Sequence, residues 1–225
     1  MELLPLGGQR SGGSRKRGGT PMSAPALYLA SQSPRRQELL RQLGVNFERL
    51  LLREAPGRPR DVVELARDDE PALHFVERIA RTKAAVGGQQ MLRRGLPPRP
   101  VLGADTEVVL DGAIFGKPRD AADAARMLAL LSGRTHHVSS AIALFWEHEV
   151  VVEIVTTAVT FRELTRAEIE HYAATGEPSD KAGAYAIQGR AAAFISRIEG
   201  SYSGVMGLPL CETALLLARI GFPVL

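Results

Sequence analysis

The chain has a single cysteine, Cys211, so no disulfide can form within it, and no group of cysteines and histidines has zinc-site spacing. Aromatic residues make up only 5% of the sequence, too few to suggest a stacking platform for single-stranded nucleic acid. No stretch reaches the roughly 18 uninterrupted apolar residues of a membrane-spanning helix. We therefore predict a cytoplasmic protein with neither a membrane nor a nucleic-acid partner.

Net charge is concentrated at the N-terminus. The formal charge of the chain is +3, and residues 1–26 alone account for it, so the remainder is neutral. An extended basic surface for a phosphate backbone is not indicated. Because residues 1–26 are rich in Gly, Ser and Arg and lack the apolar core of a signal peptide, we predict a disordered tail there, with Met22 as an alternative start, followed by one domain over residues 27–225.

The domain alternates between strand and helix patterns. With 225 residues, 45% of them hydrophobic, the chain is long enough to bury a core. Strands are predicted at 27–30, 45–52, 101–110, 113–115 and 192–198, and as a long antiparallel pair within 135–161; helices are predicted after Ser33, over 71–90, after Asp120, after Thr165 and over 209–219. Hairpins mixed with βα units predict an α/β fold, a mixed sheet flanked by helices.

The first polar segment of interest, SQSPRR at residues 31–36, leads from a strand into a helix. Ser33 suits the N-cap and Pro34 the first helical position. Backbone N–H groups there, with Arg35 and Arg36, could bind phosphate. A capped helix with solvated arginines would explain the same residues, but positive charge at a helix N-terminus is unfavourable unless an anion binds.

The second segment is GADTE at residues 103–107, inside an otherwise apolar strand. The alternation of a strand places Asp105 and Glu107 on one face, where two carboxylates could hold a divalent cation. Solvated acids at a sheet edge are the alternative interpretation. Lys83 and Lys117 are candidate phosphate ligands, although a lone lysine is more often solvated.

The third segment is DKAGAYAIQG at residues 180–189. Its small residues let the backbone approach a flat ligand, and the amide of Gln188 can both donate and accept at the edge of a base. A tight loop around a buried pair of Asp180 and Lys181 is the alternative.

Six motifs together resemble one family. LYLASQSPRR (27–36), GADTEVV (103–109), GKPRD (116–120), LSGRTH (131–136), DKAGAYAIQG (180–189) and VMGLP (205–209) resemble, in order, the motifs of Maf nucleotide pyrophosphatases. The resemblance covers residues 27–219. It implies a twisted mixed sheet with two lobes and a central cleft, similar to inosine triphosphate pyrophosphatases, and a homodimer.

The resemblance also implies roles for single residues. Asp105 matches the proton acceptor, and the residues that match phosphate-binding positions are Ser31, Arg36, Lys83 and Lys117. Arg35, Thr106 and Gln188 match the positions associated with base selection in the branch that cleaves dTTP and UTP. The implied reaction releases pyrophosphate from a nucleoside triphosphate, with a divalent cation, Mg or Mn, as cofactor.

Two positions depart from the family pattern. Glu107 stands where the family more often has an apolar residue, and residues 53–56 match poorly to an acidic segment of the family. Besides Asp105, the metal ligand is therefore expected to be Glu54 or, in its place, Glu107.

Two other functions stay open at this stage. A 7-methyl-GTP pyrophosphatase is disfavoured because Thr106, rather than Gln, follows the aspartate. A non-catalytic nucleotide-binding regulator of cell division would not need Asp105, so the presence of that acid favours the enzyme.

Overall fold

The computed structural model of the chain describes residues 26–53 and 61–224. Residues 1–25 of the predicted tail and the candidate ligand Glu54 lie outside this part of the chain. Within it, no helix is both long and apolar enough to cross a lipid bilayer.

A seven-stranded mixed sheet forms the centre of the molecule, with strand order β2-β1-β3-β5-β6-β7 and with β4 also paired to β3. The strands are β1 (Ala26–Leu29), β2 (Asn46–Arg49), β3 (Val101–Leu110), β4 (Ala113–Phe115), β5 (Thr135–Trp146), β6 (Glu149–Phe161) and β7 (Ile195–Glu199). β1 runs parallel to β2 and β3, and the other pairs are antiparallel. The predicted α/β class and mixed sheet are confirmed.

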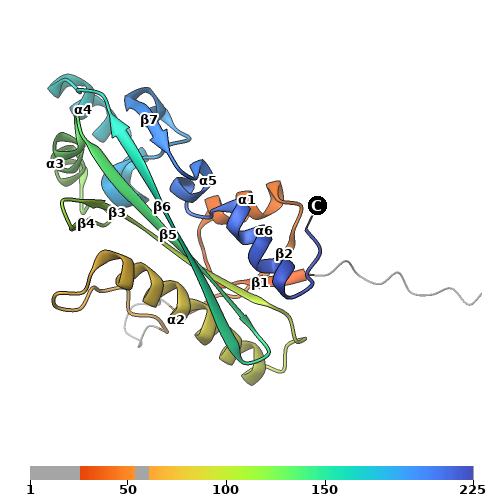
Figure 1. Ribbon diagram of the computed structural model, residues 1–225. Helices are drawn as coiled ribbons and strands as arrows, with labels where there is room; N and C mark the ends of the chain where they lie inside the picture. The colour runs from red at the N-terminus through yellow and green to blue at the C-terminus, as the bar shows by residue number, and fades with distance from the viewer. Residues whose placement is uncertain (1–25, 54–60, 225) are drawn as a thin grey trace, which may run out of the picture.

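Helices cover both faces of this sheet (Figure 1). They are α1 (Pro34–Gln42), α2 (Ala72–Arg93), α3 (Ala121–Leu131), α4 (Arg166–Ala173), α5 (Tyr202–Met206) and α6 (Leu210–Arg219), with 3-10 turns at Glu177–Asp180, Ala182–Ala184 and Arg190–Phe194. α2 lies along one face, where its apolar side packs on Val101 and Phe145.

The opposite face carries two separate groups of helices. Leu102 and Ala104 of β3 pack with α1 and α6, whereas Val108 and Leu110 pack with α3 and α4. Since all four side chains lie on the same face of β3, the strand runs from one group to the other. Each group of helices, with the part of the sheet that it covers, forms one lobe: α1 and α6 belong to the first, and α3 and α4 to the second. Thr106 lies midway between the two groups, where the lobes meet.

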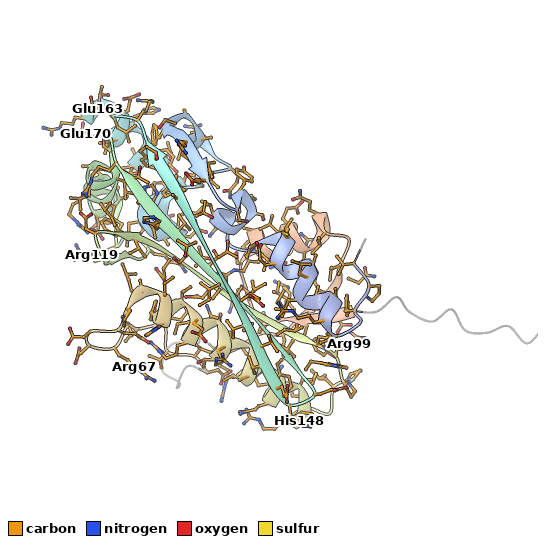
Figure 2. The ribbon with its side chains drawn as sticks, in the orientation of Figure 1. Arg67, Arg99, Arg119, His148, Glu163 and Glu170 are labelled. Carbon is orange, nitrogen blue, oxygen red and sulfur yellow. The ribbon has the colours of Figure 1, made fainter. Side chains whose placement is uncertain are left out.

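Local sequence signals account for most of the boundaries. Ser33 caps α1 with Pro34 in the first turn, Asp120 caps α3 by accepting from the N–H of Asp123, and Thr165 forms a capping box with Glu168. The turn between β5 and β6 has positive φ at Glu147 and His148, which suits a tight hairpin. Figure 2 shows His148 at the tip of this hairpin, and Glu163 and Glu170 at the opposite end of the sheet.

The prediction of a strand over 192–198 was wrong in its first half. Residues Arg190–Phe194 form a 3-10 turn, and β7 begins only at Ile195. Three consecutive alanines carry no β preference, and the burial of Phe194 fixes the turn. Helix α5, which contains the start of the VMGLP motif, was not predicted, and β2 is shorter than the predicted 45–52.

Candidate active site

The central strand β3 is left unpaired along part of one edge. β5 pairs with residues 101–109 on one side, so β1 and β4 must share the other side. There β1 pairs only with Val101 and Leu102, and β4 only with residues 108–110. Within the described chain, residues 103–107 therefore have no strand on this side, and a cavity of about 380 Å³ opens beside them.

A buried carboxylate and a buried ammonium form the centre of this cavity. Lys83 of α2 donates to Oδ1 of Asp105 at 2.8 Å and pairs with Oε1 of Glu64 at 2.7 Å. The Asp105 and Lys83 side chains are only 9% and 10% exposed. Burial acts to raise the pKa of Glu64, but the hydrogen bond and positive charge of Lys83 lower it. The Lys83 ammonium thus contacts two carboxylates at the cavity wall and favours the ionised form of Glu64.

Arg36 lies on the other side of β3 and is fixed by three acceptors. Its Nε donates to the carbonyl of Gly207 at 2.9 Å, and its two Nη atoms donate to the hydroxyls of Ser31 and Thr106 at 3.3 Å each. The Thr106 hydroxyl also lies 2.8 Å from that of Ser140. Burial lowers the pKa of Arg36, opposed by the charges of nearby carboxylates. The guanidinium is held rigidly at the cavity.

An ion pair joins the two lobes at the mouth of the cavity. Arg35 of α1 donates to Oδ2 of Asp180 at 3.1 Å, and Lys181 contacts the same carboxylate. Because the Asp180 side chain is 59% exposed, the alternative of a buried pair of Asp180 and Lys181 is not what the fold contains. Gln188 and Lys117 also line the cavity, from the lobe that contains Asp180.

Glu107 is a partly buried carboxylate with one unpaired oxygen among the described residues. Its Oε2 is buried and has no hydrogen-bond partner among the described residues. Burial, with the negative charges of Asp105 and Glu64, raises the pKa of Glu107 to about 8. The nearby charges of Lys83 and Lys117 offset this only in part, so the carboxylate is costly to ionise unless a further cation is supplied.

These features fit a divalent cation bound jointly with a substrate. No three carboxylate, imidazole or thiol groups among the described residues come close enough to hold a metal by themselves. Mg²⁺, however, is commonly bound by one or two carboxylates together with substrate phosphates and water. Asp105 and the unpaired oxygen of Glu107, on one face of one strand, could serve as such a donor set.

Every candidate residue that the structure describes lines this one cavity. The set comprises Ser31, Arg35, Arg36, Lys83, Asp105, Thr106, Glu107, Lys117 and Gln188. Sequence reasoning missed Glu64, which lies after the segment 54–60 and pairs with Lys83. Its surroundings, VVELARDDE, carry four acids, and nothing in the letters distinguishes the one that faces Lys83.

Comparison with known proteins places these residues in a family context. The family described as "Maf-like protein" matches residues 26–220. A dTTP/UTP pyrophosphatase of Aromatoleum aromaticum is 54% identical over 199 residues, which cover 88% of this chain and 97% of that protein. A dTTP/UTP pyrophosphatase of Nitrosospira multiformis is 56% identical over 191 residues, 85% of this chain and 92% of that protein. One of Nitrosomonas europaea is 52% identical over 198 residues, with coverages of 88% and 96%.

Proposed function

This chain belongs to the Maf-like protein family, and on that premise we propose that it is a nucleoside triphosphate pyrophosphatase that hydrolyses dTTP and UTP to the monophosphate and pyrophosphate. The three dTTP/UTP pyrophosphatases described above are more than half identical to this chain over most of both chains. The observation that carries the proposal is the buried pair of Asp105 and Lys83 inside a cavity ringed by basic side chains.

The basic side chains give the cavity its affinity for a triphosphate. Arg36, Lys117 and the Ser31 hydroxyl bind the phosphates in this proposal, helped by the N-terminus of α1. Because Arg36 is held by three acceptors, little side-chain entropy remains to be lost when a phosphate binds. Lys83 is bound to carboxylates, so its main task is to orient Asp105 beside the phosphates.

Asp105 acts on the attacking water. Lys83 occupies Oδ1 of this carboxylate and leaves Oδ2 for the water. The water oxygen attacks the α-phosphorus while a proton of the water passes to Oδ2 of Asp105. The bond from the α-phosphorus to the bridging oxygen breaks, and pyrophosphate leaves with the electron pair. Arg36 and Lys117 stabilise the negative charge that develops on the leaving group.

Asp105 and Glu107 would hold a divalent cation, Mg or Mn, together with the substrate. The cation would supply charge neutralisation at the phosphates. Glu54, the other candidate ligand, lies outside the described residues.

Base selection falls to the lobe contact around Arg35, Thr106 and Gln188. A uracil or thymine presents a carbonyl and an imide N–H on one edge, and the Gln188 amide can pair with both. Adenine lacks this pair of groups. Guanine has it, but its second ring carries the pair farther from the sugar, so an amide held in place for a pyrimidine leaves groups unpaired with either purine, at a cost of about 1–3 kcal/mol for each. Thr106 lines the same cavity, and its hydroxyl is bonded to Arg36.

The test is pyrophosphate release from a panel of triphosphates with Mg²⁺, measured for the wild type and for Asp105→Asn. We expect dTTP and UTP to be cleaved well ahead of ATP, GTP and 7-methyl-GTP. Asp105→Asn preserves the shape of the side chain but removes the carboxylate that accepts the proton, so turnover should fall at least about a hundredfold. Asp111→Asn, on the exposed turn between β3 and β4, is the matched control and should retain full activity.

Two results would count against this assignment. A wild-type preference for a guanine nucleotide would favour the 7-methyl-GTP branch. Near-normal turnover by Asp105→Asn would mean that Glu64 or Glu107, rather than Asp105, accepts the proton of the attacking water.

A further inference from the structure

Gln188 is an exposed side chain in a tight turn. The N–H of Gly189 donates to the carbonyl of Ala186 at 3.0 Å, so Ile187 and Gln188 are the central residues of the turn. Ile187 is buried and anchors it, whereas Gln188 is exposed and lines the cavity. The Gln188 side chain is long and flexible, so its amide can bond selectively to the edge of a base only if the backbone of the turn is fixed.

Two residues outside the cavity hold the turn at both ends. At its start, the N–H of Ala186 donates to the hydroxyl of Tyr172 at 3.2 Å. Just beyond its end, the N–H of Arg190 donates to Oε1 of Glu177 at 3.0 Å. The Tyr172 hydroxyl donates to the same Oε1 at 2.9 Å. The hydrogen bonds from Ala186 and Arg190 are thereby joined through Tyr172 and Glu177 into one relay around Gln188.

The surroundings preserve this relay. Tyr172 is 2% exposed on α4, and its ring packs edge-on against Phe194 with centroids 5.2 Å apart. Burial raises the pKa of the Tyr172 phenol, which keeps its proton available to Glu177. A Cβ at Gly189 would lie 2.6 Å from the carboxylate carbon of Glu177, so only glycine lets that carboxylate reach the backbone.

We propose that Tyr172 and Glu177 are positioning residues for base selection, which fix where the Gln188 amide enters the cavity. Neither residue lines the cavity, so both act through the turn. This inference rests on the proposed function, in which Gln188 pairs with uracil or thymine. Loosening the turn lowers discrimination between bases and leaves the phosphate contacts of the other lobe in place.

The experiment measures kcat and KM for UTP and GTP, together with the melting temperature, in Tyr172→Phe, Glu177→Ala and Glu177→Gln. Tyr172→Phe and Glu177→Ala should lower the ratio of kcat/KM for UTP to that for GTP by about tenfold, chiefly through a higher KM for UTP. Glu177→Gln keeps an amide oxygen that accepts both hydrogen bonds, so its ratio should stay within about twofold of the wild type.

Matched controls separate position from chemistry. Tyr202→Phe removes a hydroxyl from an exposed tyrosine of α5, and Glu170→Gln neutralises an exposed acid of α4; both should leave the ratio unchanged. If Tyr172→Phe does not fold, Glu177→Ala carries the test, because Glu177 is partly exposed.

Three outcomes have distinct meanings. A selectivity ratio that is unmoved in Tyr172→Phe and Glu177→Ala, with only the melting temperature lowered, overturns the inference. An equal loss for both nucleotides also overturns it. A wild type that does not favour UTP overturns the proposed function itself, which the wild-type measurement shows before any variant is compared.

Discussion

His136 is a titratable side chain that the fold forces to stay neutral. It is fully buried on β5, its Nε2 lies 2.9 Å from the Tyr185 hydroxyl, and its Nδ1 has no partner among the described residues. Burial, with a smaller contribution from His137, lowers the pKa of His136 from 6.5 to about 4. The aromatic rings of Phe161 and Tyr185 pack edge-on around it.

This shift predicts a loss of stability in mild acid. Between pH 6.5 and pH 4 the unfolded chain binds a proton at His136 that the folded chain refuses, so the free energy of unfolding falls as the pH is lowered. Between pH 7 and pH 5 the wild type should lose about 2 kcal/mol more than His136→Gln, as measured by urea unfolding. His137→Gln, an exposed neighbour, should behave like the wild type. Equal pH sensitivity in the wild type and His136→Gln would mean that the imidazole is charged in the fold.

Glu64 shows how a single residue can escape sequence reasoning. It lies in an acidic stretch without periodicity, in a segment that forms neither helix nor strand. Arg78 of α2 donates to the Leu65 carbonyl and to Glu70, which fastens this segment against the helix. Only that packing brings the Glu64 carboxylate to Lys83.

At the scale of elements, the approach of α2 to β3 determines the geometry of the Asp105 pair. Gly103 lies on the same face of β3 as Asp105, directly beneath the helix. A Cβ on Gly103 would lie 2.6 Å from the backbone oxygen of Ala80 and from the backbone nitrogen of Ala84. Since both are helix backbone atoms, they cannot move without moving α2 and with it Lys83.

Gly103→Ala should therefore lower both stability and turnover. Overpacking of this kind costs about 1–3 kcal/mol, and the shift of α2 draws Lys83 away from Asp105. Urea unfolding and pyrophosphate release measure the two effects. Gly116→Ala is the stability control, because no atom lies within 4 Å of its added methyl. Full stability of Gly103→Ala would show that α2 can shift without cost.

At the scale of the whole molecule, the cleft results from two lobes that share one strand. β3 contributes Leu102 and Ala104 to one hydrophobic cluster and Val108 and Leu110 to another. Thr106, which lies between these clusters on the same face, is in the gap between the two lobes and lines the cavity. The start of α1, which we propose binds phosphate, and the turn after α4, which we propose contacts the base, both line this cavity.

The family match begins at residue 26 and β1 begins at Ala26, so the N-terminal residues lie outside the matched domain. Removal of residues 1–22 should leave kcat, KM and the melting temperature unchanged. Removal of residues 1–30 is the matched control and should prevent folding, because β1 pairs with both β2 and β3. A large loss of activity in the shorter truncation would show that residues 1–22 contribute to the domain.

The sequence by itself determined the features that depend on neighbours along the chain. The cap at Ser33, the helices that begin after Asp120 and Thr165, and the hairpin of β5 and β6 follow from short-range geometry and periodicity, and they were predicted correctly. The alternation of β3 also placed Asp105 and Glu107 on one face. Short apolar or alanine-rich stretches such as 190–194 carry no such signal, which is why the start of β7 was misplaced.

Only the tertiary structure decided which distant residues meet. Arg36 bonds Thr106 across 70 positions of sequence, Lys83 bonds Asp105 across 22, and Ala186 bonds Tyr172 across 14. Such contacts depend on the packing of α2 on the sheet and on the gap between the lobes. The secondary-structure propensities of single residues do not predict either arrangement. The open edge of β3, the Glu64 contact and the relay around Gln188 exist only once the strands have paired, because pairing, unlike capping, is a relation between segments far apart in the chain.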